Sequence, residues 1–191
     1  RREHASQQMW SNVIGYGHWL ARLPFVRMVA ITGALSMHNS DADDDYDYIL
    51  VTAPGRVWLA RAFAILLVRL SKIRGVTLCP NYVLAEDRLE QQDRNLYIAH
   101  EIVQMLPLYG RSCYDAFRWH NLWADSHLPN ANQPFYDTGD HIVSGVWRVL
   151  KTALERLLGG RLGDRLEQWE RQRKMSRFPP HLETPHSRAR L

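Results

Sequence analysis

The chain has little cysteine, little lysine and no long apolar run, and each shortage narrows the classes to which it can belong. Its two cysteines, Cys79 and Cys113, fit neither a metal-binding pair nor a disulfide framework, so a reducing compartment is the default expectation. The most apolar stretch, AFAILLV at 62–68, is far shorter than the roughly 20 residues of a membrane span. No apolar signal segment stands near the N-terminus. We therefore expect a cytoplasmic protein with no membrane partner.

The charged residues are unevenly distributed along the chain. Lysine supplies only three of the 24 cationic residues, and arginines crowd the region after residue 147, whereas five aspartates fall between 41 and 47. The planar fork of arginine suits phosphate, but an arginine-rich helix is most often a solvated face. Nucleic acid is thus the less favoured partner, and an RNA-binding module with salt-sensitive affinity is a third hypothesis.

Apolar periodicity divides the chain into an alternating first half and a helical second half. It predicts helices at 7–23, 56–75, 92–106, 112–124 and 141–158, and strands at 25–32, 46–52 and 76–85. Pro80 inside the third strand indicates an edge position or a bulge. We expect a mixed α/β (α+β) fold with a core at 1–90, a helical accessory region at 91–176 and a disordered tail at 177–191.

The aspartate cluster first suggests a calcium-binding loop beginning at Asp41. Such a loop needs glycine at its sixth position and a bidentate glutamate at its twelfth, where this chain has Tyr46 and Thr52. A calcium loop of that kind is excluded.

Asp45 and Asp47 form an Asp-x-Asp pair at the entrance of the second predicted strand. Residues two apart in a strand point to the same face, so the two carboxylates can share a divalent ion while Tyr46 and Tyr48 point the opposite way. Oxygen-only sites suit Mg²⁺ or Mn²⁺. Taken without further context, a solvated acidic loop is the stronger reading of this pair.

The surrounding residues strengthen the metal hypothesis. Gly33-Ala34 is followed by ten residues and then by DYDYIL, which begins at Asp45. This arrangement resembles the nucleotidyltransferase superfamily of the DNA polymerase β type, whose signature is a glycine-led turn followed by Asp-hydrophobic-Asp-hydrophobic. The resemblance covers about residues 9–85 and implies an αβαβαβ core with a small mixed sheet.

The resemblance also implies a function and roles for individual residues. Gly33 and Ala34 would hold the phosphates of a nucleoside triphosphate (NTP), and Asp45 and Asp47 would bind Mg²⁺ (or Mn²⁺). The activity would be transfer of a nucleoside monophosphate from NTP to an acceptor that the sequence does not identify.

Two departures from the family pattern leave alternatives open. Ala34 stands where the family often has serine, so a hydroxyl contact to phosphate would come from Ser36 or Thr32. The third carboxylate usual on the third strand is missing: Asn81 occupies that strand, and Glu86 or Asp87 follows it. The alternative function is therefore a degenerate member of the family that binds nucleotide or a partner without turnover.

Overall fold

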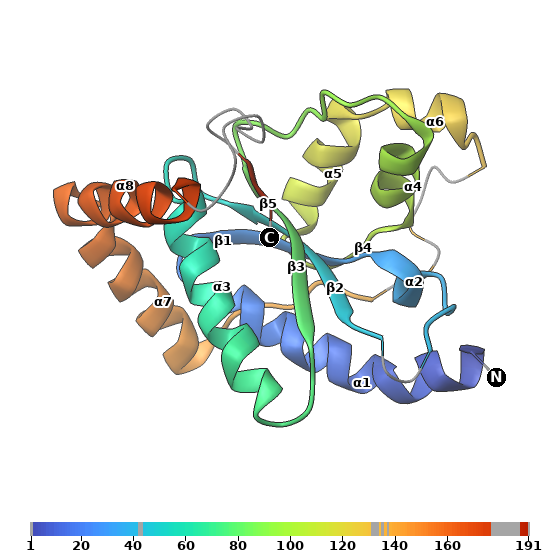
Figure 1. Cartoon of the computed structure of the whole chain (residues 1–191), viewed down its shortest axis with the longest axis horizontal. Coiled ribbons are helices and arrows are strands. Elements are labelled where there is room, and N and C mark those ends of the chain that lie inside the picture. The colour runs from blue at the N-terminus through green and yellow to red at the C-terminus, as the bar shows by residue number, and fades with distance from the viewer. Residues whose placement is uncertain are drawn as a thin grey trace.

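The computed structural model describes residues 2–41, 44–130, 134, 136, 138–176 and 188–190, in which helices cover both faces of one sheet (Figure 1). The elements in chain order are α1 (Arg2–Ala21), β1 (Val26–Ile31), α2 (Gly33–Ser36), β2 (Tyr46–Thr52), α3 (Val57–Lys72), β3 (Leu78–Ala85), α4 (Leu96–Gln104), β4 (Leu106–Tyr109), α5 (Arg111–His120), α6 (Trp123–His127), α7 (Gly145–Leu158), α8 (Arg161–Met175) and β5 (Arg188–Arg190). Within this described part, no helix combines the length and apolar character that a membrane span requires.

The sheet is mixed and has the strand order β4-β1-β2-β3-β5 among the described residues. Strand β1 runs antiparallel to β2 and β4, β2 runs parallel to β3, and β3 runs antiparallel to β5. The predicted α/β class is confirmed, and the first six elements follow the predicted αβαβαβ order.

Alternating side chains of β2 reach two separate cores. Tyr46, Tyr48 and Leu50 pack with α1 and α3 on one face, whereas Ile49 and Val51 pack with α4 and α5 on the other. The buried Tyr48 hydroxyl donates a hydrogen bond of 2.6 Å to the Val13 carbonyl and ties α1 to the sheet. The sequence predicts that Tyr46 and Tyr48 point away from Asp45 and Asp47, and the alternation along β2 agrees with this prediction.

Strand β3 contains the bulge that Pro80 indicates. Tyr48 pairs with Pro80 and Ile49 pairs with Tyr82, so Asn81 is an extra residue without a partner on β2. A bulge of this kind turns the extra side chain away from its regular direction.

The region after residue 90 is not purely helical. Leu106 and Pro107, expected to end a helix, instead belong to β4 and pair with Ile31 and Ala30 at the edge of the sheet, where a proline is tolerated. The helix expected over 112–124 is interrupted at Asn121, whose side-chain amide donates to the Phe117 carbonyl.

The tail expected to be disordered from residue 177 is partly ordered. Residues 188–190 form β5 and pair with β3, which corrects that expectation for this segment. Residues 177–187 and 191 lie outside the described part of the chain.

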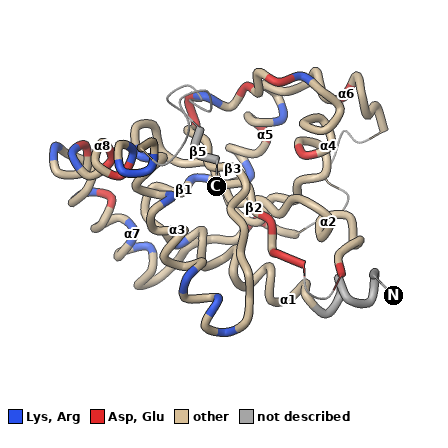
Figure 2. Tube along the Cα trace, viewed as in Figure 1, with Lys and Arg blue, Asp and Glu red and all other residues tan. Residues whose placement is uncertain are grey.

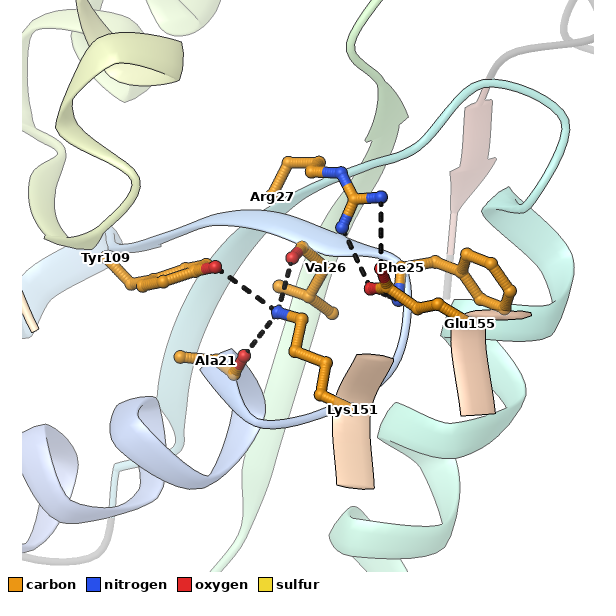
Figure 3. A network of polar contacts seen from close by, with 7 residues as sticks. All are labelled: Ala21, Phe25, Val26, Arg27, Tyr109, Lys151 and Glu155. Carbon is orange, nitrogen blue, oxygen red and sulfur yellow. Dashed lines mark hydrogen bonds and ion pairs between the residues drawn. The ribbon is translucent and has the colours of Figure 1, made fainter. Parts of the chain in front are cut away.

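Helix α7 is attached to the core through a buried lysine (Figure 3). The Lys151 ammonium donates to the carbonyls of Ala21 and Val26, each at 2.7 Å, and to the Tyr109 hydroxyl at 3.3 Å. Burial lowers the pKa of Lys151 to about 8, so the ammonium form is the main one at pH 7. Through this one side chain, α7 is joined to the end of α1, to the start of β1 and to Tyr109 of β4.

We expect Lys151→Met to lower the free energy of unfolding by about 2–5 kcal/mol, because it leaves buried carbonyl groups without donors. Urea denaturation at pH 7 measures the change. Lys72→Met, which removes an exposed cation from the end of α3, is the matched control and should change stability by less than about 0.5 kcal/mol. Equal losses in the two variants would contradict a structural role for the Lys151 contacts.

Candidate functional site

The Asp45–Asp47 pair lies where β2 begins, next to the end of β1 and the turn that follows it (Figure 2). The backbone N–H of Thr32 donates to the Asp47 carbonyl at 3.0 Å and extends the β1–β2 ladder up to this turn. Asp45 is exposed and Asp47 is half-buried. The predicted metal pair and the predicted phosphate turn therefore meet in one place.

Gly33 lies directly against the Asp47 carboxylate. Its φ of +68° is in the left-handed region, and a Cβ added to it would stand 2.4 Å from Asp47 Oδ2. Glycine is needed here both for the backbone conformation and for the space. The backbone of the turn thereby comes close to the predicted metal ligand, and the adjacent Ala34 is exposed to solvent.

Asn81 reaches the same carboxylate from β3. Its Nδ2 donates to Asp47 Oδ1 at 2.8 Å, and its Oδ1 accepts a hydrogen bond from the Cys79 thiol at 3.0 Å. The bulge at this position directs the extra side chain toward the mouth of β2. Asn81 therefore belongs to the site, as a hydrogen-bond donor that positions Asp47.

A further carboxylate, Glu101 of α4, belongs to this site, and the sequence did not identify it. Glu101 Oε2 accepts a hydrogen bond of 2.8 Å from the Thr32 hydroxyl, one residue before Gly33. A visible signal was present, because Glu101 interrupts the apolar face of α4 that contains Ile98 and Ile102, both of which are buried. An acid inside an apolar stripe points into the protein, where it needs a polar partner.

The negative charges of Asp45 and Glu101 act on the Asp47 carboxylate. Burial, together with the negative charges of Glu101 and Asp45, raises the pKa of Asp47 to about 6, although the hydrogen bond from Asn81 acts in the opposite direction. Negative charges held this close together attract a cation.

The oxygen donors fit Mg²⁺ only if other ligands complete its shell. Among the described residues, no three histidine, cysteine, aspartate or glutamate side chains are close enough together to hold a metal ion. Mg²⁺ commonly binds through one or two carboxylates, with water and substrate phosphates as its remaining ligands. Asp45 and Asp47 could serve as those two carboxylates.

Two predicted site residues are placed unsuitably for their expected roles. The Ser36 hydroxyl is fully buried and donates to the Gly33 carbonyl at 2.7 Å, so it is not free for a phosphate. Glu86 follows the far end of β3, where its N–H bonds the Thr52 carbonyl, while Asp47 pairs with Cys79 near the opposite end. Because β2 and β3 are parallel, the length of the strands separates Glu86 from Asp47, and the same applies to Asp87.

The remaining aspartates of the cluster have a local role. The N–H of Asp41 donates to Asp44 Oδ2 at 2.8 Å, and the N–H of Asp44 donates to the Asp41 carbonyl at 3.1 Å. Both side chains are exposed, as expected for a solvated loop, and Asp43 lies outside the described residues.

Comparison with known proteins does not assign the chain to a family. No family model, no curated protein and no solved structure matches the chain.

We expect Gly33→Ala to destabilise the protein more than Gly75→Ala does. Gly75 also has a positive φ, of +73°, but a Cβ there would meet nothing within 4 Å. Backbone strain should cost about 1–2 kcal/mol at either position, and the contact with Asp47 should add at least about 1 kcal/mol at Gly33. Thermal and urea unfolding of the two variants measure the difference, and equal losses would contradict the close contact with Asp47.

Proposed function

We propose that the protein is a nucleotidyltransferase, which transfers a nucleoside monophosphate from an NTP to an acceptor with the help of Mg²⁺ and releases pyrophosphate. The observation that carries this proposal is the contact between Gly33 and the Asp47 carboxylate. It brings a left-handed glycine turn, in which the next residue, Ala34, is exposed to solvent, beside an acidic pair suited to a divalent ion.

Each residue of the site has a role in this proposal. Asp45 and Asp47 hold the ion that carries the triphosphate, and the Gly33–Ala34 backbone lies beside the phosphates. Asn81 keeps Asp47 in place through its hydrogen bond to Oδ1. A bound Mg²⁺ supplies neutralisation of the phosphate charge during in-line displacement at the α-phosphate.

Glu101 acts as the general base in this proposal, because β3 offers no acid for that role. The Asn81 amide cannot accept a proton, whereas the Glu101 carboxylate can remove one from the acceptor hydroxyl as that hydroxyl attacks the α-phosphate. The hydrogen bond from Thr32 holds Glu101 next to the phosphate turn.

A second candidate function is nucleotide binding without turnover. It is favoured by the position of Asn81, whose amide donates a hydrogen bond to Asp47. Asn81 stands in the part of β3 where active members of the superfamily carry an acid. Wild-type protein that binds NTP with Mg²⁺ but transfers nothing would support this candidate.

We expect NTP to bind only in the presence of Mg²⁺ and to bind about tenfold or more weakly to Asp47→Asn, which removes a charged ligand. Isothermal titration calorimetry with each of the four NTPs, with and without Mg²⁺, measures this affinity. Glu86→Gln is the matched control, because it removes an acid at the far end of the strand pair and should leave binding unchanged. Binding without Mg²⁺ that survives Asp47→Asn would refute the metal site.

We expect Glu101→Gln to lower nucleotidyl transfer by about 10²–10⁴-fold, the range for loss of a general base, while NTP affinity stays within about threefold. Transfer of label from α-phosphate-labelled NTP, to added acceptors or to the protein itself, measures the rate. The glutamine retains an acceptor for the Thr32 hydroxyl, so the fold of the turn should be preserved. A rate equal to that of the wild type would exclude Glu101 as the base.

A further inference from the structure

An apolar groove lies between α1 and the C-terminal end of α3. It has a volume of about 340 Å³, and its apolar walls are Tyr16 and Trp19 of α1 with Leu67, Leu70 and Ile73 of α3 and the turn after it. Its surroundings are apolar as well, because Leu66 and Leu70 are exposed and Ile73 is 82% exposed. We call the surface made by these six residues the α1–α3 face. A contiguous exposed apolar surface marks a contact site.

A pair of tryptophans extends the α1–α3 face to helix α7. Trp19 meets Trp147 of α7 edge to face, with the ring centroids 5.0 Å apart. The Arg22 guanidinium lies over both rings, 4.5 Å from the centroid of Trp19 and 5.2 Å from that of Trp147. Leu150, one turn further along α7, is exposed beside Trp147. The extended surface therefore combines aliphatic side chains with tryptophan and arginine.

The charged residues on the end of α3 are positive. Arg69, Lys72 and Arg74 are exposed, and none of them forms an ion pair with a described residue. At about 100° per residue, Arg69 and Lys72 stand beside the row that contains Leu66 and Leu70. Figure 2 shows these cations at the C-terminal end of α3.

Acidic residues are absent from the segments that build this surface. The segments 9–23, 56–75 and 141–154 contain no aspartate or glutamate, although the chain has 20 acidic residues. The cations at the end of α3 therefore have no acid within their own surface to neutralise them. An apolar surface with uncompensated cations beside it is complementary to a layer that is apolar inside and negative at its surface.

We propose that the α1–α3 face binds the surface of a membrane that contains anionic lipids. The aliphatic side chains and the two tryptophans would enter the boundary between headgroups and acyl chains, where tryptophan is favoured. Arg69, Lys72 and Arg74 would extend to the lipid phosphates, since long cationic side chains can lie along an apolar surface and keep their charge at its edge.

This association is peripheral, so it requires no helix that spans the bilayer. The expectation of no membrane partner was based on the lack of a spanning segment, whereas this proposal concerns a protein that lies on one surface. A second copy of the chain is disfavoured as the occupant. A symmetric contact uses the same surface on both copies, and the segments 9–23, 56–75 and 141–154 offer no acid to pair with the cations of the other copy.

The test uses the full chain and two kinds of vesicle, one of phosphatidylcholine alone and one of phosphatidylcholine mixed with phosphatidylserine. Co-sedimentation measures the partition of the protein onto each. We expect partition onto the mixed vesicles to be at least about tenfold stronger, because the cations meet negative headgroups. Added salt should weaken this partition, because it screens the charges at the membrane surface.

A matched pair of leucine variants tests the apolar part of the surface. Leu70→Glu places a carboxylate where the side chain would enter the bilayer boundary, and it should weaken partition onto the mixed vesicles by at least about tenfold. Leu96→Glu is the control, because Leu96 of α4 is 54% exposed and Leu70 is 52% exposed. This control should partition as the wild type does. Circular dichroism checks that both variants are folded, as expected for a helix former such as glutamate.

A second pair of variants tests the cations. Arg69→Gln combined with Lys72→Gln should weaken partition onto the mixed vesicles by about tenfold or more and leave partition onto pure phosphatidylcholine unchanged. Arg161→Gln combined with Arg165→Gln is the control. It removes two exposed cations from α8, which contacts the start of α3 and not its end. This control should behave as the wild type.

The other outcomes overturn the proposal. Failure to sediment with either kind of vesicle, or equal partition onto both, would contradict recognition of an anionic membrane surface. Equal losses in a test variant and its control would contradict the assignment to the α1–α3 face. A dimer in sedimentation velocity that Leu70→Glu dissociates would assign this face to a second copy of the chain. None of these measurements depends on the nucleotide site.

Discussion

The hydrogen bond from the Thr32 N–H to the Asp47 carbonyl is the contact on which the geometry of the candidate site depends. It carries the β1–β2 ladder to the point where one strand ends and the other begins. The residues on either side of this bond must therefore lie together: Gly33 against the Asp47 carboxylate, and the Thr32 side chain against Glu101. A shift of one residue in this pairing would move Asp47 to the other face of the sheet.

The site is assembled from three neighbouring strands of the sheet and one helix packed against it. Strand β2 contributes the acidic pair, the turn after β1 contributes the glycine, the bulge of β3 contributes Asn81, and α4 contributes Glu101. The raised pKa of Asp47 is the electrostatic result of this convergence, because burial and two neighbouring carboxylates all oppose its ionisation. Unusual pKa values of this kind tend to mark functional sites.

Buried polar contacts help to attach the C-terminal hairpin of α7 and α8 to the core. Its contacts with the core include the three hydrogen bonds of Lys151 and the apolar packing of Leu158 and Leu166, whereas Val146, Val149 and Leu157 of α7 are exposed. Buried polar contacts have strict directions, so they fix the rotation of a helix more narrowly than apolar packing does. These contacts hold the hairpin in one orientation.

Local patterns in the sequence determined most of the first half of the fold. The strand at Tyr46–Thr52 was predicted with the bounds that it has, and alternation along it separated the core tyrosines from the aspartates. Pro80 predicted an edge position or a bulge, and the structure has the bulge. These features depend on neighbours within a few residues, so periodicity and proline positions are sufficient to find them.

Only the tertiary structure decided which distant residues meet. It placed Glu101 beside the turn at Gly33, removed Ser36 and Glu86 from their expected positions in the site, added β4 and β5 to the sheet and left the apolar side of α7 exposed. The periodicity of a helix shows that one side is apolar, but not which side the rest of the chain will cover. That choice depends on the partners of Lys151 and Glu155, and the partners within residues 21–27 lie more than 100 residues away in sequence.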